Sequence, residues 1–229
     1  MSARSDEDTA PVEIELKFEV LDARSLRPLF EPDVDPEPTG LAGFRPLSPA
    51  SSREVFDLYL DTAHGRLRAA GLAARIRSEG GRHRLTVKST AEPVRGAIYR
   101  RLEVEGPARP TPDPATWPPS AARDVVVAAV GRAWLRVVAC IRQHRQTRLL
   151  GRGPTTVELS LDELEALAGP RDERVLDRRV ELEAELVKGE LEDLEALAAA
   201  LAVRSGLVAA GGSKLDWARG ALVRERRTR

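Results

Sequence analysis

Ionisable side chains recur at every second position in six segments of this sequence. Residues two apart lie on the same face of a β-strand, so each segment would present its charges to one side. The opposite face of these segments is mostly apolar. The segments carry Glu13, Glu15 and Lys17; Arg75 and Arg77; Arg84, Thr86 and Lys88; Arg101, Glu103 and Glu105; Glu158, Ser160 and Asp162; and Glu181, Glu183 and Glu185.

For any one strand, the ordinary explanation is a sheet with one face on the core and the other in water. Solvated faces normally mix in Thr, Ser and Gln. Here the polar faces of six segments are almost entirely ionisable, and acidic and basic residues are largely segregated by segment. The pattern therefore favours an enclosed charged site over a solvated surface.

The chemistry of such a site follows from charge repulsion. Carboxylates on adjacent strands repel one another unless a cation lies between them, and Mg²⁺ or Mn²⁺ prefers carboxylate oxygens. Basic pairs repel in the same way unless an anion bridges them, and the planar fork of arginine matches phosphate oxygens. The sequence therefore predicts a polyanion and a divalent cation bound together inside a barrel.

Eight strands would position these residues. Apolar–polar alternation and turn residues predict strands at 12–20, 54–60, 72–78, 82–88, 98–105, 137–150, 155–162 and 180–187. Gly80–Gly81 would join two of them in a hairpin. Many strands with short turns and few helices indicate an antiparallel barrel or sandwich.

Helices and loops complete one domain over residues 11–229, after a leader at 1–10 that we expect to be disordered. Helices are predicted at 22–30, 121–134 and 189–203, and Ser213 can N-cap a final helix. Two Pro-rich segments, 31–52 and 106–120, are predicted to be loops. The first of them could be a lid or an insertion.

Composition excludes several classes of protein. The 36 basic and 36 acidic residues give no net charge, which argues against a nucleic-acid-binding protein. Cys140 is the only cysteine, so neither an intramolecular disulfide nor a thiolate metal site is expected. No apolar run approaches the ~20 residues of a membrane span, and no signal peptide is visible, so we expect a cytoplasmic protein. Neither a P-loop motif nor G-x-G-x-x-G is present.

Together, these segments resemble the CYTH, or triphosphate tunnel metalloenzyme, family. Glu13 to Lys17 resembles its ExExK motif, which is weak alone, and seven further segments match in order between residues 12 and 220. They are Tyr59 to Thr62, which resembles Y-F-D-T; Gly71 to Arg77, which resembles G-x-x-x-R-x-R; Leu85 to Lys88, which resembles L-T-x-K; Arg101 to Glu105, which resembles R-x-E-x-E; the acidic strands Val157 to Asp162 and Glu181 to Glu185; and Gly212 to Arg219, which resembles S-K-x-x-R-G.

The resemblance implies an α+β fold, in which eight antiparallel strands close into a tunnel with peripheral helices. It also implies a triphosphate substrate and two metal ions, Mg²⁺ or Mn²⁺, with water attacking the terminal phosphorus in line. By position, the implied metal ligands are Glu13, Glu15, Glu183 and Glu185, with Glu181 as a further ligand or the partner of one. The implied catalytic residues are Lys17, Glu103, Glu105, Glu158 and Asp162. The implied phosphate-binding residues are Lys17, Arg75, Arg77, Lys88, Arg101, Arg145 and Lys214.

One segment, 141–148, leaves a choice open. Arg142, Arg145 and Arg148 compete to be the inward basic residue, and they do not share one strand parity. We therefore predict a bulge among them and favour Arg145. His144, like His64 and His83, is expected to be a surface or hydrogen-bonded residue rather than a catalyst.

The substrate is predicted from what the sequence lacks. Family substrates include inorganic triphosphate, thiamine triphosphate, nucleoside triphosphates and RNA 5′-triphosphates, and ATP for class IV adenylyl cyclases. Recognition of a base or thiazole ring usually needs an aromatic platform, yet Trp117 and Trp134 fall outside the predicted strands. Inorganic triphosphate is therefore favoured. The alternatives are a polyphosphate-binding module, with a helical CHAD domain as partner if the chain is an excised fragment, or an enzyme acting on thiamine triphosphate or ATP.

Overall fold

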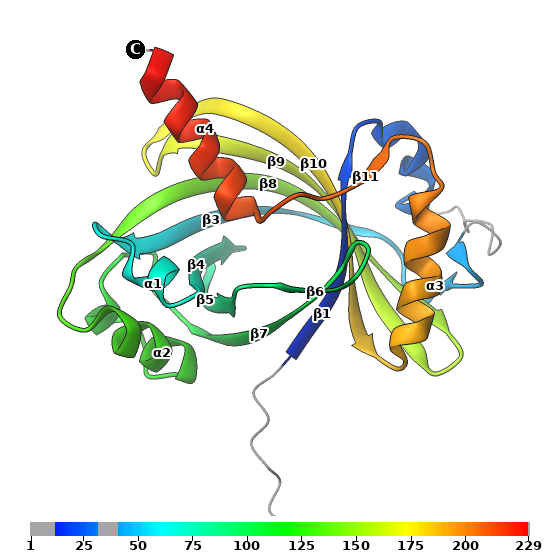
Figure 1. Ribbon diagram of the computed structural model, residues 1–229, viewed down its shortest axis with the longest axis horizontal. Helices are drawn as coiled ribbons and strands as arrows, with labels where there is room; N and C mark the ends of the chain where they lie inside the picture. The colour runs from blue at the N-terminus through cyan, green and yellow to red at the C-terminus, as the bar shows by residue number, and fades with distance from the viewer. Residues whose placement is uncertain (1–11, 32–40, 229) are drawn as a thin grey trace, which may run out of the picture.

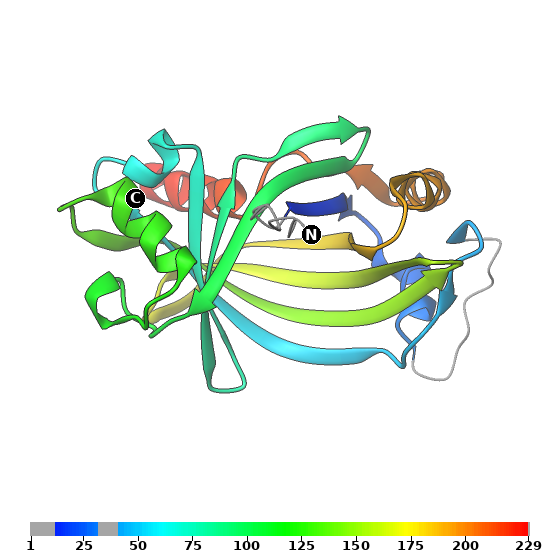
Figure 2. The same ribbon diagram turned by 90° about the horizontal axis from the view of Figure 1, so that it is seen from below.

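The computed structural model describes residues 12–31 and 41–228. Eight of its strands close into an antiparallel barrel: β1 (Val12–Val20), β3 (Ser51–Thr62), β4 (Leu72–Glu79), β5 (Arg82–Ser89), β7 (Ile98–Pro107), β8 (Leu135–Arg152), β9 (Thr155–Gly169) and β10 (Asp172–Lys188). Around the barrel the order is β1, β10, β9, β8, β3, β4, β5 and β7, and β7 pairs back onto β1 (Figures 1 and 2). The closed eight-stranded barrel of an α+β fold is confirmed.

Strands β9 and β10 extend well beyond the predicted ones. Residues 163–179 are rich in Glu, Leu, Ala and Arg, which favour helices in isolation, and the alternation there is poor. In the structure they continue β9 and β10 as a paired hairpin, from Glu181 opposite Asp162 to Asp172 opposite Gly169. Pairing with a neighbouring strand therefore overrides the local propensity.

The hairpin between β4 and β5 forms as predicted. Gly80 and Gly81 both have positive φ, at 53° and 78°. A two-residue turn of this kind needs φ > 0 at both positions, which glycine adopts without a Cβ clash. The turn fixes the register that places Arg77 directly opposite Arg84.

Short elements account for the other differences from the predictions. The predicted helix at 22–30 is two 3₁₀ turns, Ala23–Ser25 and Arg27–Leu29, and a third such turn is Pro114–Thr116. Strands β2 (Arg45–Pro46), β6 (Glu92–Arg95) and β11 (Leu207–Ala209) and helix α1 (Arg66–Ala69) were not predicted. The leader at 1–10 and part of the 31–52 loop lie outside the described residues.

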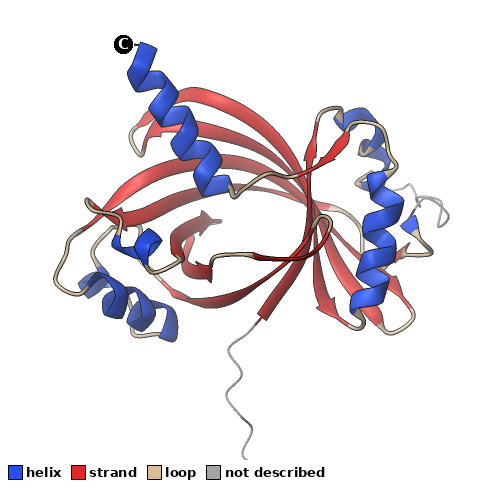
Figure 3. Cartoon of the chain, in the orientation of Figure 1, coloured by secondary structure: helices blue, strands red, loops and turns tan. Residues whose placement is uncertain are grey.

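Three longer helices pack around the barrel (Figure 3). They are α2 (Ala121–Val130), α3 (Leu191–Ala202) and α4 (Lys214–Thr228). Helix α2 ends four residues earlier than predicted, because Gly131 has a φ of 59°. Ser213 caps α4 as predicted, its Oγ accepting a hydrogen bond from the Asp216 amide at 3.1 Å. None of the described helices is long and apolar enough to cross a membrane.

The apolar faces of the strands pack outward against these helices. Leu16 and Leu182 lie in one core with Leu194 and Leu197 of α3, whereas the outer face of β3, β4 and β5 packs against α1 and α2. The apolar core therefore surrounds the barrel, and the opposite, ionisable face of each strand is left to line the interior.

Helix α4 differs because it packs on the inner face at one part of the barrel. Ala218 and Ala221 contact a cluster that includes Tyr59, Ile141 and Leu164. Ile141 pairs directly with inward-facing Asp57, which places its side chain on the inner side of the sheet. The helix thereby carries its first residue, Lys214, into the barrel.

Replacement of the core residue Leu182 by alanine should lower the free energy of unfolding. Leu182 is 0% exposed, so Leu182→Ala leaves a cavity beneath α3 and should cost about 2–5 kcal/mol. Val187→Ala, on the same strand at a 55% exposed position, is the matched control and should cost less than about 1 kcal/mol. Chemical denaturation would check both values, and equal losses would contradict the assignment of the core.

Candidate functional site

A charged cavity of about 1380 Å³ occupies the barrel. Its charges are divided by strand, and the division follows the order of the barrel. The predicted site carboxylates come from β7, β1, β10 and β9, which are consecutive neighbours, whereas β8, β3, β4 and β5 supply Arg145, Arg53, Arg75 and Arg77, and Arg84 and Lys88. One half of the wall is therefore mainly acidic and the other mainly basic.

Most of the predicted site residues line this cavity. They are Glu13, Glu15, Lys17, Arg75, Arg77, Lys88, Arg101, Glu103, Glu105, Arg145, Glu158, Glu183, Glu185 and Lys214. The other two, Asp162 and Glu181, are 0% exposed and lie behind the cavity wall. The structure thus brings the whole predicted set into one barrel interior but divides it into residues at the surface of the cavity and residues beneath it.

Ion pairs join the two halves at the seam where β7 meets β1. Arg101 donates from Nε to Glu13 Oε2 at 2.5 Å and from Nη2 to Glu15 Oε1 at 2.6 Å. Lys88 Nζ lies 2.8 Å from Glu13 Oε1 and 2.9 Å from Glu103 Oε2. Burial alone would raise the pKa of Glu13, but Lys88 and Arg101 outweigh it and lower that pKa to about 2.

The remaining carboxylates of the acidic half are crowded. Burial and then the Glu13 carboxylate raise the pKa of Glu185 to about 7, despite the opposing charge of Lys88. Burial and Glu183 raise the pKa of Glu15, and burial raises that of Glu103 although Lys88 opposes it. Part of the negative charge on this wall is therefore not neutralised by the protein's own cations.

The donor chemistry of the acidic half fits a divalent metal ion. Carboxylate oxygens are the ligands that Mg²⁺ and Mn²⁺ prefer, and burial together with neighbouring carboxylates raises the pKa of Glu15 and Glu185, an unfavourable ionisation that a bound cation would relieve. Among the described residues, no group of three or more His, Cys, Asp or Glu side chains is arranged to hold a metal ion. Glu13 and Glu15 instead point at Arg101, so metal binding would need these side chains to turn.

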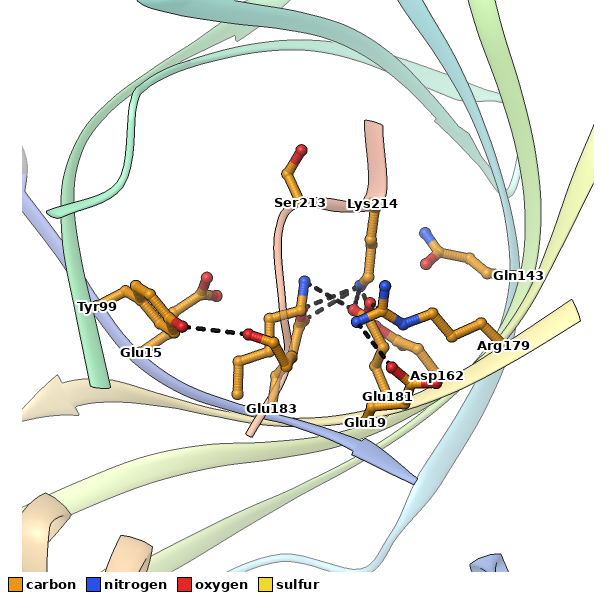
Figure 4. A network of polar contacts seen from close by, with 12 residues as sticks. Glu15, Glu19, Tyr99, Gln143, Asp162, Arg179, Glu181, Glu183, Ser213 and Lys214 are labelled. Atoms are coloured by element: carbon orange, nitrogen blue, oxygen red, sulfur yellow. Dashed lines mark hydrogen bonds and ion pairs between the residues drawn. The ribbon is translucent and has the colours of Figure 1, made fainter. Parts of the chain in front are cut away.

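Two lysines and three carboxylates form a buried network that joins the cavity wall to the residues beneath it (Figure 4). Lys17 Nζ lies 2.7 Å from Glu181 Oε2 and 3.2 Å from Glu183 Oε1. Lys214 Nζ lies 2.5 Å from Asp162 Oδ2 and 3.2 Å from Glu183 Oε1. Glu183 is therefore the carboxylate shared by both lysines.

These contacts explain the charge states in the network. Burial would raise the pKa of Glu183, but Lys214, Lys17 and Arg145 hold it well below its ordinary value. Arg145 forms a two-point contact with Asp162, at 2.6 Å from both Nε and Nη2. Glu181, which contacts Lys17, also lies 3.0 Å from Arg179. The sequence motifs did not single out Arg179. Asp162 and Glu181 are thus placed to hold the basic side chains.

A carboxylate on the basic half was missed by the sequence analysis. Asp57 of β3 accepts hydrogen bonds from Arg77 at 2.9 and 2.8 Å, from Arg75 at 3.4 Å, and from Gln143 at 3.1 Å. Its position two residues before Tyr59, on the same strand parity, is the signal that could have identified it. Burial opposes its ionisation, but Arg75 and Arg77 lower its pKa to about 2.

The choice among the three arginines of β8 is settled by the strand register. Arg145 lines the cavity, whereas Arg142 pairs with Glu165 at 2.8 Å, and Arg148 donates to the carbonyl groups of Ser48 and Leu29. The predicted bulge is wrong. The pairing with β9 is continuous from position 140 to 152, and the irregularity against β3 lies opposite Tyr59 and Leu60. Arg142 and Arg148 simply occupy the outer face.

Two tyrosines line the cavity, although the tryptophans do not. Tyr59 is 6% exposed and packs in the apolar cluster beneath α4, and the Tyr99 hydroxyl donates to the Ala210 carbonyl at 3.2 Å. Trp117 is buried beside α2 and Trp134 is 86% exposed. Both tyrosine rings are therefore held by other contacts.

Two of the three histidines make local contacts, and His64 is exposed. His83 lies at the rim of the cavity, where its Nδ1 is 2.9 Å from Ser78 Oγ, and His144 lies 2.7 Å from Glu54 Oε1 on the outer face. Asp61 lines the cavity but uses its carboxylate to accept from the Thr62 and Leu67 amides at 2.7 and 2.9 Å. The contacts of His83, His144 and Asp61 therefore stabilise local structure.

Comparison with known proteins identifies relatives of this fold. The family model described as CYTH domain matches residues 11–215, and no curated protein matches the chain. A candidate adenylyl cyclase from Hippeastrum, HpAC1, described as having a dominant triphosphatase activity, has a TM-score of 0.65 at 22% identity, covering 91% of this chain and 95% of that one. A candidate adenylate cyclase from Bacillus halodurans has a TM-score of 0.55 at 14% identity, covering 90% and 97%. At these identities, the likeness to solved structures shows the shared fold.

The crowding around Glu185 predicts a pH-dependent loss of stability. Its pKa rises from 4.5 to about 7 on folding, so its ionisation disfavours the folded state as the pH rises through that range. In EDTA, Glu185→Gln should therefore be stabilising at about pH 8 but not at about pH 4.5. Because the side chain is open to water in the cavity, the gain should be modest, ~1 kcal/mol or less. Denaturation curves at both pH values check this, and a gain independent of pH would contradict it.

Proposed function

This chain belongs to the CYTH domain family, and we propose that it is a metal-dependent hydrolase that cleaves the terminal phosphoanhydride bond of inorganic triphosphate. The observation that carries the proposal is the division of one enclosed cavity into an acidic and a basic half. A purely anionic or purely cationic ligand would leave one half uncompensated. A triphosphate together with a divalent metal ion matches both.

The basic half would bind the phosphate chain. Arg75 and Arg77 of β4 lie beside β5, which carries Lys88, and Arg145 faces the cavity from β8. Guanidinium groups bind phosphate oxygens through two donors at once, whereas the lysines act as point charges. In the proposed complex these residues, with Lys17, Arg101 and Lys214, hold the triphosphate in one orientation.

The acidic half would hold the metal ion. Glu13, Glu15, Glu183 and Glu185 are the proposed ligands, and Glu181 would act from behind the wall through Lys17. When bound, Mg²⁺ or Mn²⁺ would supply charge neutralisation and activation of the attacking water. The phosphate would draw Lys88 and Arg101 toward itself and so release Glu13 and Glu15.

The chain's own residues would then act mainly by position. Lys17 is held by two carboxylates, and burial, which would lower its pKa, is outweighed by Glu183 and Glu181, so it stays charged. Glu105 is oriented by Thr86 at 3.0 Å, and Glu103 by Lys88. Glu103, Glu105, Glu158 and Asp162 are the proposed carboxylates that orient water or the cations around it. Positioned charge of this kind is the main source of catalysis in phosphoryl transfer.

Inorganic triphosphate is favoured over substrates that carry a ring. Base or thiazole recognition usually uses a free aromatic face, whereas Tyr59 is packed beneath α4 and Tyr99 is tethered to the Ala210 carbonyl. The basic side chains of the cavity match phosphate oxygens and require no ring. A polyphosphate-binding module without catalysis would have little use for the complete acidic half.

Phosphate release would test the proposal against its alternatives. Inorganic triphosphate, ATP, thiamine triphosphate and long-chain polyphosphate would each be incubated with Mg²⁺, Mn²⁺ or EDTA. We expect metal-dependent release from inorganic triphosphate and at least tenfold slower release, as an order-of-magnitude estimate, from the ring-bearing substrates. Tight polyphosphate binding with no release from any substrate would contradict an enzyme, and preference for ATP or thiamine triphosphate would contradict the proposed substrate.

Glu13→Gln and Glu15→Gln should each abolish turnover. Each change removes one proposed metal-binding charge with little change in volume, so a loss of kcat of about 10² or more is expected. The matched control is Glu165→Gln, because this carboxylate also pairs with arginine but lies on the outer face. Steady-state kinetics with added Mn²⁺ measure the effect. Full activity in both tunnel variants would rule out the metal assignment.

Arg75→Ala should mainly weaken substrate binding. The side chain lines the cavity from β4, so its loss should raise KM about tenfold or more. Arg142→Ala, which removes an arginine from the outer face, serves as the control and should leave KM unchanged. Unchanged KM and kcat in Arg75→Ala would place that side chain outside the substrate site.

A further inference from the structure

Asp57 is a buried carboxylate on the basic half of the tunnel. It is 0% exposed and, among the described residues, is not one of those that line the cavity. Its cross-strand partner Arg77 does line the cavity, as does Arg75 two residues earlier on β4. A negative charge behind an anion-binding wall weakens that wall's attraction for a phosphate, so its presence requires another benefit.

That benefit is geometric. Arg77 presents Nε and Nη2 to the two oxygens of Asp57, at 2.9 and 2.8 Å, which fixes the plane of the guanidinium group. Arg75 reaches Oδ2 with Nη1 at 3.4 Å, and Gln143 reaches the same oxygen with Nε2 at 3.1 Å from the opposite neighbouring strand. A single carboxylate therefore ties three side chains on two strands.

Two arginines on one face of a strand would otherwise turn away from each other. Their charges repel, and a long side chain that is free in the apo protein loses rotamer freedom when it binds a ligand. Asp57 offsets the repulsion and removes this freedom before the substrate arrives. Burial would raise the pKa of Asp57, but the two arginines lower it, so the carboxylate stays ionised.

We propose that Asp57 is the positioning residue that orients Arg75 and Arg77 toward the triphosphate. The inference rests on the proposed function, because those two arginines are its phosphate-binding residues. Asp57 itself does not contact the substrate and acts through the arginines alone. Loss of its charge would make the cavity more positive, so a purely electrostatic role predicts tighter binding of triphosphate, whereas positioning predicts weaker binding.

The chain contains a matched control on its outer face. Glu165 of β9 also lies between two arginines, at 2.8 Å from Arg142 and 3.0 Å from Arg178. Its pair faces away from the cavity. Glu165→Gln and Asp57→Asn therefore each neutralise a carboxylate that lies between two arginines, the first in a partly exposed cluster outside the proposed site and the second in a buried cluster behind it.

The test is the affinity for tripolyphosphate, measured by titration calorimetry in EDTA so that turnover is not needed. Asp57→Asn should weaken binding about tenfold, comparable to the loss of one charge-assisted fork, and Glu165→Gln should leave it unchanged. Unchanged or tighter binding in Asp57→Asn, with the wild type binding normally, would overturn the positioning role. Absence of binding by the wild type, both in EDTA and with a divalent cation added, would overturn the proposed function instead.

A double-mutant cycle separates positioning from a general structural effect. Arg77→Lys keeps the charge but cannot form the two-point contact, so it should weaken binding to a similar extent. In Asp57→Asn/Arg77→Lys the losses should not multiply, because both changes remove the same constraint. Multiplying losses would overturn the proposal. If circular dichroism shows that Asp57→Asn does not fold, Arg77→Lys alone decides, since unchanged binding in that variant would also overturn it.

Discussion

Charge compensation inside the barrel is the constraint on which the rest of this structure depends. A closed barrel whose strands point ionisable side chains inward must pair those charges or bind ions, because unpaired buried charge is costly. Arg101 meets this need at the seam by contacting both Glu13 and Glu15, and Lys214 meets it by entering the barrel from α4. The apolar residues are then displaced to the outside of the barrel, which is why the cores lie beneath α1, α2 and α3.

The compensation is complete in some places and incomplete in others, and the difference indicates where ligands would bind. Asp57 and Glu13 each contact two basic side chains and have pKa values near 2. Glu185 lies among other carboxylates and has a pKa near 7. Asp57 thus holds the wall in place, whereas the crowded carboxylates provide the excess charge for a cation. A bound triphosphate would compete for Lys88 and Arg101, so binding of the anion and of the cation should be coupled.

Alternation was sufficient to predict the barrel strands and the face on which the charges lie. The pattern from Glu13 to Lys17 could not show which carboxylates remain at the cavity surface. That depends on which of them contact a lysine or arginine from another strand or helix. Glu181 lies behind the wall for this reason, where Lys17 and Arg179 contact it. Asp57 was missed because it is an isolated acid in a segment that is otherwise apolar. Residues 163–179 have helical propensity, and only pairing between β9 and β10 makes them strand.

We expect a triphosphate and a divalent metal ion to occupy the tunnel together, each against the wall of opposite charge. Anomalous diffraction from crystals grown with Mn²⁺ and tripolyphosphate would test this arrangement. We expect a manganese peak bounded by Glu13, Glu15 and Glu185, with phosphate density against Arg75 and Arg77. Manganese and phosphate density confined to the outer surface, with the carboxylates still paired to Arg101, would contradict it.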